Sequence, residues 1–389
     1  MKNTLFLITL FLLVLTGCSK TDTSNKAAFI TKLGNDTLAV EVFEKTEHGI
    51  SAKVILRSPT TTLTSYYLTL DGGNGIKNLA AYTHSLEDGF ESEGQISLQI
   101  ENLGDSLRIE RLWQGETRSS TIENQPGVLP FIDMVHWPFE IAFNNARSFN
   151  SDTIYQPLIS GSRISDFIVA TIRPDSMTIR HPSRGVMGAR VSETGNLQFL
   201  DAGLTTRKLK VYREPANSLN IAQLGAHFAQ NDLTGNPFGE LSSAEEATFY
   251  IGDTEFIVSY GSPKKRGREL FGAIVPWGER WRTGANRATH FYTSKDLVIE
   301  GLEVPAGEYT LFTVPEPDGG TLIINKQTGQ NGRSYDESKD LGRITMTILS
   351  KEDITEAFTI TVEETNIGGN LNLIWGQAVF SVNFKINPS

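Results

Sequence analysis

Apolar and polar residues alternate along most of this 389-residue chain, and this period of two constrains the fold more than any other feature. The alternation is clear in runs such as 38–42, 66–70 and 96–100, and a Gly-rich turn at 71–75 follows one of them. Such a pattern places apolar side chains on one face of a half-buried antiparallel strand. We therefore predict a mainly β protein of the β-rich α+β class.

The alternation divides the chain into two parts of different character. Residues 28–213 are expected to form a curved antiparallel sheet with one helical segment, and residues 247–389 an antiparallel β-sandwich of nine short strands. Between them, residues 214–246 are predicted to form a helical linker, with Asn217 or Ser218 as the helix cap. A mature chain of this length exceeds what one hydrophobic core normally holds, so two domains are expected.

The helical segment of the first domain is predicted at 128–149, where Phe131, Val135 and Phe139 recur at helical spacing. Pro138 lies inside this pattern, so either the helix is kinked or a second helix starts there. One helix on a curved sheet resembles the half-barrels of lipoprotein carriers. That resemblance implies an acyl chain held between sheet and helix.

Four polar residues of the same segment fall on one helical stripe, namely Asp133, His136, Glu140 and Asn144. Such a stripe is compatible with an acid–base or metal site. The alternative, which we favour, is the solvated face of an amphipathic helix. The six histidines of the chain show no metal-ligand spacing, so we expect no metal and no cofactor.

The N-terminus carries one lysine, an apolar run at 5–16, and then Cys18, the only cysteine of the chain. The run is shorter than the roughly 20 residues needed to span a membrane, so residues 1–17 are predicted to be a signal peptide. Leu-Thr-Gly-Cys at 15–18 resembles the lipobox of bacterial lipoproteins. The resemblance implies a diacylglycerol on Cys18, a lipidated tether at 18–27 and attachment to the membrane through that lipid.

Two consequences follow from this terminus. A lipidated Cys18 leaves no free thiol, which excludes disulfides, Cys-ligated metals and a Cys nucleophile. Ser19 stands where some bacteria place an inner-membrane retention Asp, so the cell envelope, and within it the outer membrane, is the favoured location. The net charge of −10 repels phosphate backbones and argues against nucleic acid as a partner.

The alternation fails between residues 260 and 289. Trp-Arg-Thr-Gly-Ala-Asn at 281–286, together with the segments at 304–311 and 323–326, resembles a bacterial family called domain of unknown function 2911. The resemblance covers the last third of the chain and implies a fold and an envelope setting, but no activity. Members usually have a Trp before the strand at 323–326 and another where this chain has Asn331.

This block is rich in Lys and Arg within an acidic protein. Arginine offers a planar fork for carboxylate or phosphate, and indole rings offer a stacking face. We predict a site for an anionic glycan or peptide end. The alternative is structural, with arginines paired to acidic neighbours and Trp rings covering the core. The predicted ligand-binding residues are Arg266, Arg268, Trp277, Trp281, Arg282, Asn286 and Thr289.

The common motifs of serine hydrolases, zinc proteases and nucleotide-binding loops do not occur in the sequence. We therefore expect no catalytic residues and a non-catalytic role as a cell-envelope binding or assembly lipoprotein with a glycan, lipid or protein ligand. Two alternatives stay open. One is a lipid carrier that uses the N-terminal half-barrel, and the other is an envelope hydrolase that uses the Arg-rich block.

Overall fold

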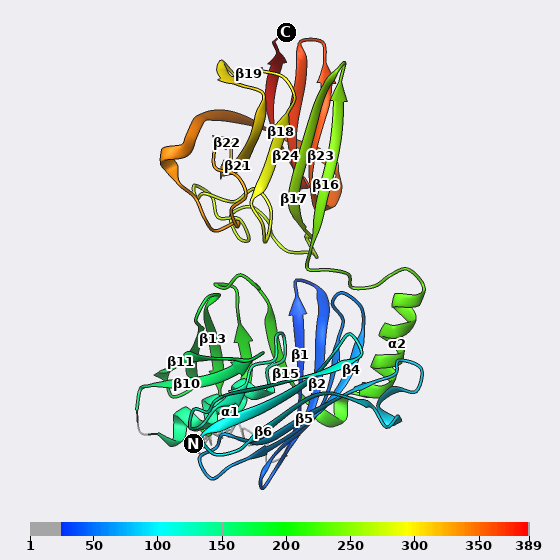
Figure 1. Ribbon diagram of the computed structural model, residues 1–389, viewed down its shortest axis with the longest axis vertical. Helices are drawn as coiled ribbons and strands as arrows, with labels where there is room; N and C mark the ends of the chain where they lie inside the picture. The colour runs from blue at the N-terminus through cyan, green and yellow to red at the C-terminus, as the bar shows by residue number, and fades with distance from the viewer. Residues whose placement is uncertain (1–24, 150, 388–389) are drawn as a thin grey trace, which may run out of the picture.

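The computed structural model describes residues 25–149 and 151–387, so Cys18, the signal segment and most of the tether lie outside the described residues. It consists mostly of strands, which form two large sheets in two lobes placed end to end (Figure 1). The predicted fold class is confirmed, with an open curved sheet followed by a C-terminal sandwich. In the described ranges, neither helix has the length and apolar character to cross a bilayer.

The N-terminal lobe, residues 26–233, holds a fifteen-stranded sheet in which β1 lies in the middle. The chain runs outward strand by strand to β8 at one edge, crosses to β9 at the other, and returns to β15, which pairs with β1. All neighbours are antiparallel except β9 and β10. The strands are β1 (Lys26–Leu33), β2 (Asp36–Thr46), β3 (Gly49–Leu56), β4 (Thr62–Leu70), β5 (Ile76–His84), β6 (Gln95–Asn102), β7 (Ser106–Trp113), β8 (Glu116–Glu123), β9 (Leu129–Pro130), β10 (Thr153–Ser160), β11 (Arg163–Arg173), β12 (Ser176–His181), β13 (Gly185–Val191), β14 (Leu197–Asp201) and β15 (Lys210–Pro215).

The two ends of this sheet approach each other, so that the sheet curls into a half-barrel. Arg111 Nη2 of β7 donates to the Gly161 carbonyl in the β10–β11 turn at 3.0 Å. The hydroxyls of Ser120 and Ser162 lie 3.1 Å apart. The alternating strands therefore present a concave face that a single helix can fill.

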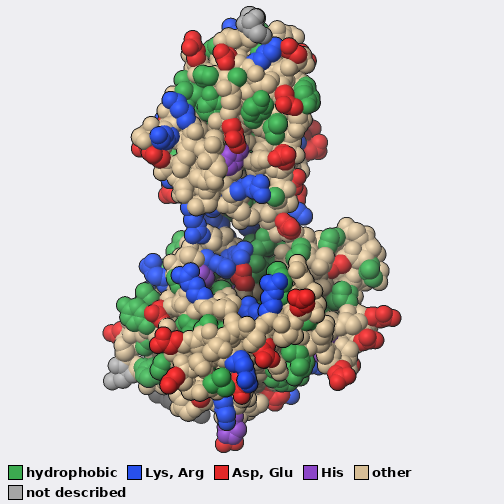
Figure 2. Space-filling model, viewed as in Figure 1, with side chains coloured by type: hydrophobic (Ala, Val, Ile, Leu, Met, Phe, Trp, Pro, Cys, Tyr) green, Lys and Arg blue, Asp and Glu red, His purple; other side chains and the backbone are tan. Residues whose placement is uncertain are grey.

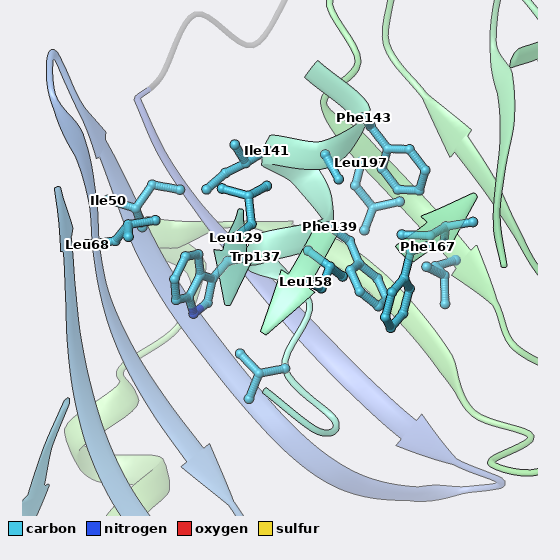
Figure 3. Close-up of a cluster of buried hydrophobic side chains, with 14 of the residues drawn as sticks. Ile50, Leu68, Leu129, Trp137, Phe139, Ile141, Phe143, Leu158, Phe167 and Leu197 are labelled. Carbon is cyan, nitrogen blue, oxygen red and sulfur yellow. The ribbon is translucent and has the colours of Figure 1, made fainter. Parts of the chain in front are cut away.

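That helix is α1 (Trp137–Ser148), and its apolar side chains pack into the concavity against the sheet (Figure 3). It is shorter than the helix predicted at 128–149. Pro138 occupies the first turn, where its missing N–H costs nothing, and residues before Trp137 form β9 and a loop. Trp137 and Phe143 are fully buried.

The polar side of α1 is buried too, so the expectation of a solvated face is wrong. Glu140 is fully enclosed, and its carboxylate lies 2.7 Å from Lys45 Nζ and 2.6 Å from Arg213 Nη1. Asn144 Nδ2 donates to the Thr194 carbonyl at 2.7 Å. The sheet encloses the first turns of this short helix, so Glu140 needs protein partners, whereas Asn144 is only part-buried.

The N-terminus of α1 is capped from a neighbouring strand. The buried Glu41 carboxylate of β2 accepts the backbone N–H groups of His136 at 2.9 Å and Trp137 at 3.0 Å. These are helix-start N–H groups that have no partner inside the helix, and a carboxylate also suits the positive end of the helix dipole. The described residues contain no group of three His, Cys, Asp or Glu arranged for a metal ion.

The predicted linker at 214–246 contains a helix, α2 (Ile221–Leu233), which packs on the opposite face of the curved sheet. Its cap is Asn220, whose side chain accepts the Gln223 N–H at 3.0 Å, and not Asn217 or Ser218, which form a short 3-10 turn. Phe228 of α2 packs with Ile55 and Leu63. The helix thus belongs to the N-terminal lobe.

The C-terminal lobe, residues 242–386, is a nine-stranded sheet folded on itself into a sandwich. Four of the nine predicted short strands merge into two long strands, β23 and β24. Bulges between Ser350 and Thr359 bend the ladder between these two strands without ending it. Its strands are β16 (Ser242–Ile251), β17 (Thr254–Pro263), β18 (Thr289–Thr293), β19 (Leu297–Ile299), β20 (Leu302–Val304), β21 (Gly307–Glu316), β22 (Gly319–Asn325), β23 (Asp340–Thr365) and β24 (Gly368–Ile386).

The ion pairs of Glu140 generate the first prediction. Replacing Glu140 with Ala leaves Lys45 and Arg213 without their shared carboxylate inside the lobe. Breaking a buried pair in this way costs about 3–5 kcal/mol, and we expect that loss in the free energy of unfolding measured with urea. The control is Glu101→Ala, which breaks a half-exposed pair with Arg108 and should cost less than about 1 kcal/mol. Equal losses in the two variants would show that Glu140 does not anchor α1.

Candidate functional site: a basic cleft between the lobes

The two lobes meet where the β1–β2 turn packs against Arg266. Asn35 donates its backbone N–H to the Arg266 carbonyl at 3.0 Å, and the Arg266 guanidinium pairs with Asp36 at 2.7 Å. The same guanidinium lies 3.7 Å from the ring centre of Phe238 and donates to its carbonyl at 2.8 Å. Arg266 is only 6% exposed. The structure therefore places this predicted ligand residue inside the lobe contact.

Beside this contact, a cleft of about 830 Å³ opens between the lobes. Figure 2 shows the molecule hollowed at this waist, with Lys and Arg side chains gathered around the hollow. Among the described residues that line the cleft there is no Asp or Glu. Each lobe contributes three cations, Arg184, Arg207 and Lys208 from the N-terminal lobe and Arg268, Arg282 and Arg333 from the C-terminal lobe.

On the N-terminal side, two arginines share one carboxylate. Arg184 donates to both oxygens of Asp133, at 2.5 and 3.2 Å, and Arg207 donates to Oδ2 at 2.5 Å. Burial opposes ionisation of Asp133, but the two guanidinium groups outweigh it and lower its pKa. Two cations against one carboxylate leave a net positive charge on this wall.

On the C-terminal side, the cations have no ion-pair partner among the described residues. Arg268 Nε donates to the Lys265 carbonyl at 3.0 Å, and Arg282 Nη1 to the Asn286 carbonyl at 3.4 Å. Burial, and after it the charge of Arg266, lowers the pKa of Arg268 to about 10. Burial and the nearby Arg333 also lower the pKa of Arg282. Both groups stay cationic at neutral pH and repel their neighbours.

Like charges also face each other across the cleft. Burial, followed by Arg268 of the other lobe, lowers the pKa of Lys208. The pKa of His181 falls to about 4, mainly by burial and then by Arg184, with Arg333 of the opposite lobe contributing. Burial is the larger cause of both shifts, and the like charges add a smaller repulsion that a bound anion would reduce.

The seven predicted ligand residues therefore separate into three groups. Arg266 lies in the lobe contact, two residues lie away from the cleft, and four line it. Trp281 lines the cleft and stacks on Trp375 at 6.0 Å, so it also covers the end of the sandwich core. Trp277 stacks on Phe271 away from the lining, and Thr289 is buried, with its hydroxyl bonded to the Thr283 carbonyl at 2.6 Å. The predicted residues that the structure brings to the cleft are Arg268, Trp281, Arg282 and Asn286.

Sequence reasoning missed the other half of the cleft. Arg184 and Arg207 lie in two loops of the first lobe, separate from the Arg-rich block, and no local pattern connects them to it. Arg333 lies in a long polar stretch of the C-terminal lobe. Asn331, where the resemblance implies a Trp, lines the same cleft, so this wall is more polar here than the resemblance implies.

A second cavity of about 720 Å³ lies in the half-barrel. Its walls include Tyr66, Leu98 and Ile109 of the sheet, with Phe131 opposite them. Phe139 and Phe143 of α1 do not line this cavity, because both are buried in the filled core around α1.

Fold and site together define a two-lobed β protein with a basic inter-lobe cleft. A family model described as a protein of unknown function (DUF2911) matches residues 242–384, which is the C-terminal lobe. The resemblance of the last third of the chain to this family is thereby confirmed. A search of curated proteins finds no match to the chain.

The lobe contact can be tested at two glycines in hairpin turns. Gly34 and Gly104 both have positive φ, so Ala at either should cost about 1–2 kcal/mol. A Cβ on Gly34 would also lie 2.0 Å from the Arg266 carbonyl oxygen, whereas one on Gly104 meets nothing. We expect Gly34→Ala to lose about 1–3 kcal/mol more than Gly104→Ala in urea unfolding and to expose Phe238 to chymotrypsin. If both variants resist chymotrypsin equally, the turn does not hold the lobes together.

Proposed function

We propose that this chain is a non-catalytic, lipid-anchored binding protein of the bacterial envelope that holds an anionic glycan in the cleft between its lobes. The observation that carries the proposal is the charge of the cleft. Six Lys and Arg residues and no described carboxylate line it, in a protein with a net charge of −10. Such a concentration of one sign attracts and holds ligands of the opposite sign.

The other lining residues suit a sugar. The Trp281 ring offers an apolar face of the kind that packs against pyranose rings. Asn286 and Asn331 offer amide groups for sugar hydroxyls. The volume of the cleft also lies within the range of typical ligand sites, about 300–1,000 Å³.

Binding can be measured by calorimetry on the mature protein in detergent. We expect trigalacturonate, which carries three carboxylates, to bind, and the neutral maltotriose to bind much more weakly. Arg282→Gln should reduce the affinity for trigalacturonate at least about tenfold, because it removes a charge-assisted contact. Lys385→Gln, an exposed cation on β24 outside the cleft, is the matched control and should have no effect.

Two results would count against this function. The first is equal binding of maltotriose and trigalacturonate, which would show that charge is not recognised. The second is unchanged binding in Arg282→Gln together with a lower melting temperature, which would assign Arg282 to the structural role considered above.

The lipid anchor and the outer-membrane location rest on the sequence around Cys18. Mass spectrometry of the N-terminal tryptic peptide should find it beginning at Cys18 and carrying diacylglycerol together with an amide-linked acyl chain. A free Cys18 thiol, or a mature chain beginning elsewhere, would rule out the anchor.

A lipid carrier is the second candidate, because the half-barrel cavity of about 720 Å³ is open and partly apolar. Trp113, Leu112 and Ile132 add to its apolar lining. Native mass spectrometry of the same sample distinguishes the candidates. A non-covalent acyl lipid that leaves on activation would favour the carrier.

A further inference from the structure

We infer that the ligand of the cleft carries at least two separated anionic groups, one bound by each lobe. This inference rests on the proposed function and names its ligand class more closely. It follows from how the six cations are distributed between the lobes and from what holds each group in place.

The first group of cations is formed by two loops of the N-terminal lobe. Arg184 lies in the turn between β12 and β13, and Arg207 and Lys208 lie in the loop between β14 and β15. Their antiparallel strands are neighbours in the curved sheet, which brings both loops to the edge that faces the other lobe. The group is therefore built by the N-terminal lobe alone.

Asp133 positions this first group from behind. Arg184 and Arg207 line both the cleft and a small cavity toward α1, whereas Asp133 lines that cavity and the half-barrel cavity but not the cleft. The carboxylate thus holds the two guanidinium groups on the side away from the cleft. Arg207 Nε is buried and has no hydrogen-bond partner among the described residues.

The second group belongs to the C-terminal lobe. Arg268 and Arg282 lie in the long segment between β17 and β18, and Arg333 lies in the loop after β22. These side chains bond only to backbone carbonyls or remain without an ion-pair partner among the described residues. Glu356 and Asp36 act on Arg268 from a distance without forming an ion pair with it.

A ligand with one anionic group would satisfy one group of cations and leave the repulsion across the cleft in place. A ligand with two such groups neutralises both walls. Once one anionic group of the ligand is bound, the other anionic group binds at a high effective concentration. This raises the affinity by about 10²–10⁴-fold when the spacing fits. The contact of the buried Arg266 with the half-exposed Asp36 restrains the distance between the walls. A peptide end has a single carboxylate, so an oligosaccharide with several acidic sugars fits the cleft better.

The test compares galacturonate with trigalacturonate by calorimetry on the mature full-length protein. We expect trigalacturonate to bind at least about 100-fold more tightly, well beyond the threefold that its three carboxylates give statistically. Arg207→Gln on one wall and Arg282→Gln on the other should each bring the affinity for trigalacturonate to within about tenfold of that for galacturonate. Arg173→Gln and Lys385→Gln, exposed cations outside the cleft, should leave both affinities unchanged.

The outcomes separate this inference from the proposed function. If galacturonate and trigalacturonate bind with affinities within threefold of each other, the two-anion ligand is overturned while the cleft remains an anion site. If neither acid binds, both proposals fail. The comparison of the two ligands uses the unaltered protein, so it does not depend on whether any variant folds.

Discussion

The contact between Arg266 and the β1–β2 turn decides what the two lobes can do together. The Arg266 guanidinium is buried, stacked on Phe238 and paired with Asp36. It keeps one geometry, because breaking these contacts would leave a poorly solvated charge without a partner. Gly34 permits the close approach, since no side chain fits between its turn and the Arg266 carbonyl. The cleft exists because this contact brings two basic loop regions face to face without closing the space between them.

The same principle operates inside the N-terminal lobe. A curved sheet around the start of one short helix excludes solvent from the polar groups there, so buried partners replace it. Glu41 caps the helix start and Glu140 binds Lys45 and Arg213. These contacts orient α1 so that Phe139 and Phe143 fill one part of the concavity. The remaining part, beside Phe131, stays open as the half-barrel cavity.

The cleft and the cavity share a boundary but differ in chemistry. The small cavity between them is lined by Phe131 and Asp133, which also face the half-barrel, and by Arg184 and Arg207, which also face the cleft. Asp133 therefore lies at the junction, where it neutralises part of the charge of two arginines and aligns them. This arrangement favours recognition of anions at the waist and of apolar or hydroxyl-bearing groups within the half-barrel.

The amino-acid sequence by itself determined the β-rich class, the curved sheet followed by a sandwich, and the position of the irregular Arg-rich block, because these depend on local periodicity and its failure. It also identified four residues that line the cleft, since Arg268, Trp281, Arg282 and Asn286 lie near one another in the chain. Only the tertiary structure decided that Arg184 and Arg207 complete the site and that Arg266 is withdrawn from it. It also decided that His136 and Glu140 of the predicted polar stripe are interior. Each of these features depends on which distant segments pack together. Neither the charge of a residue nor its spacing in the sequence indicates which partner will neutralise it.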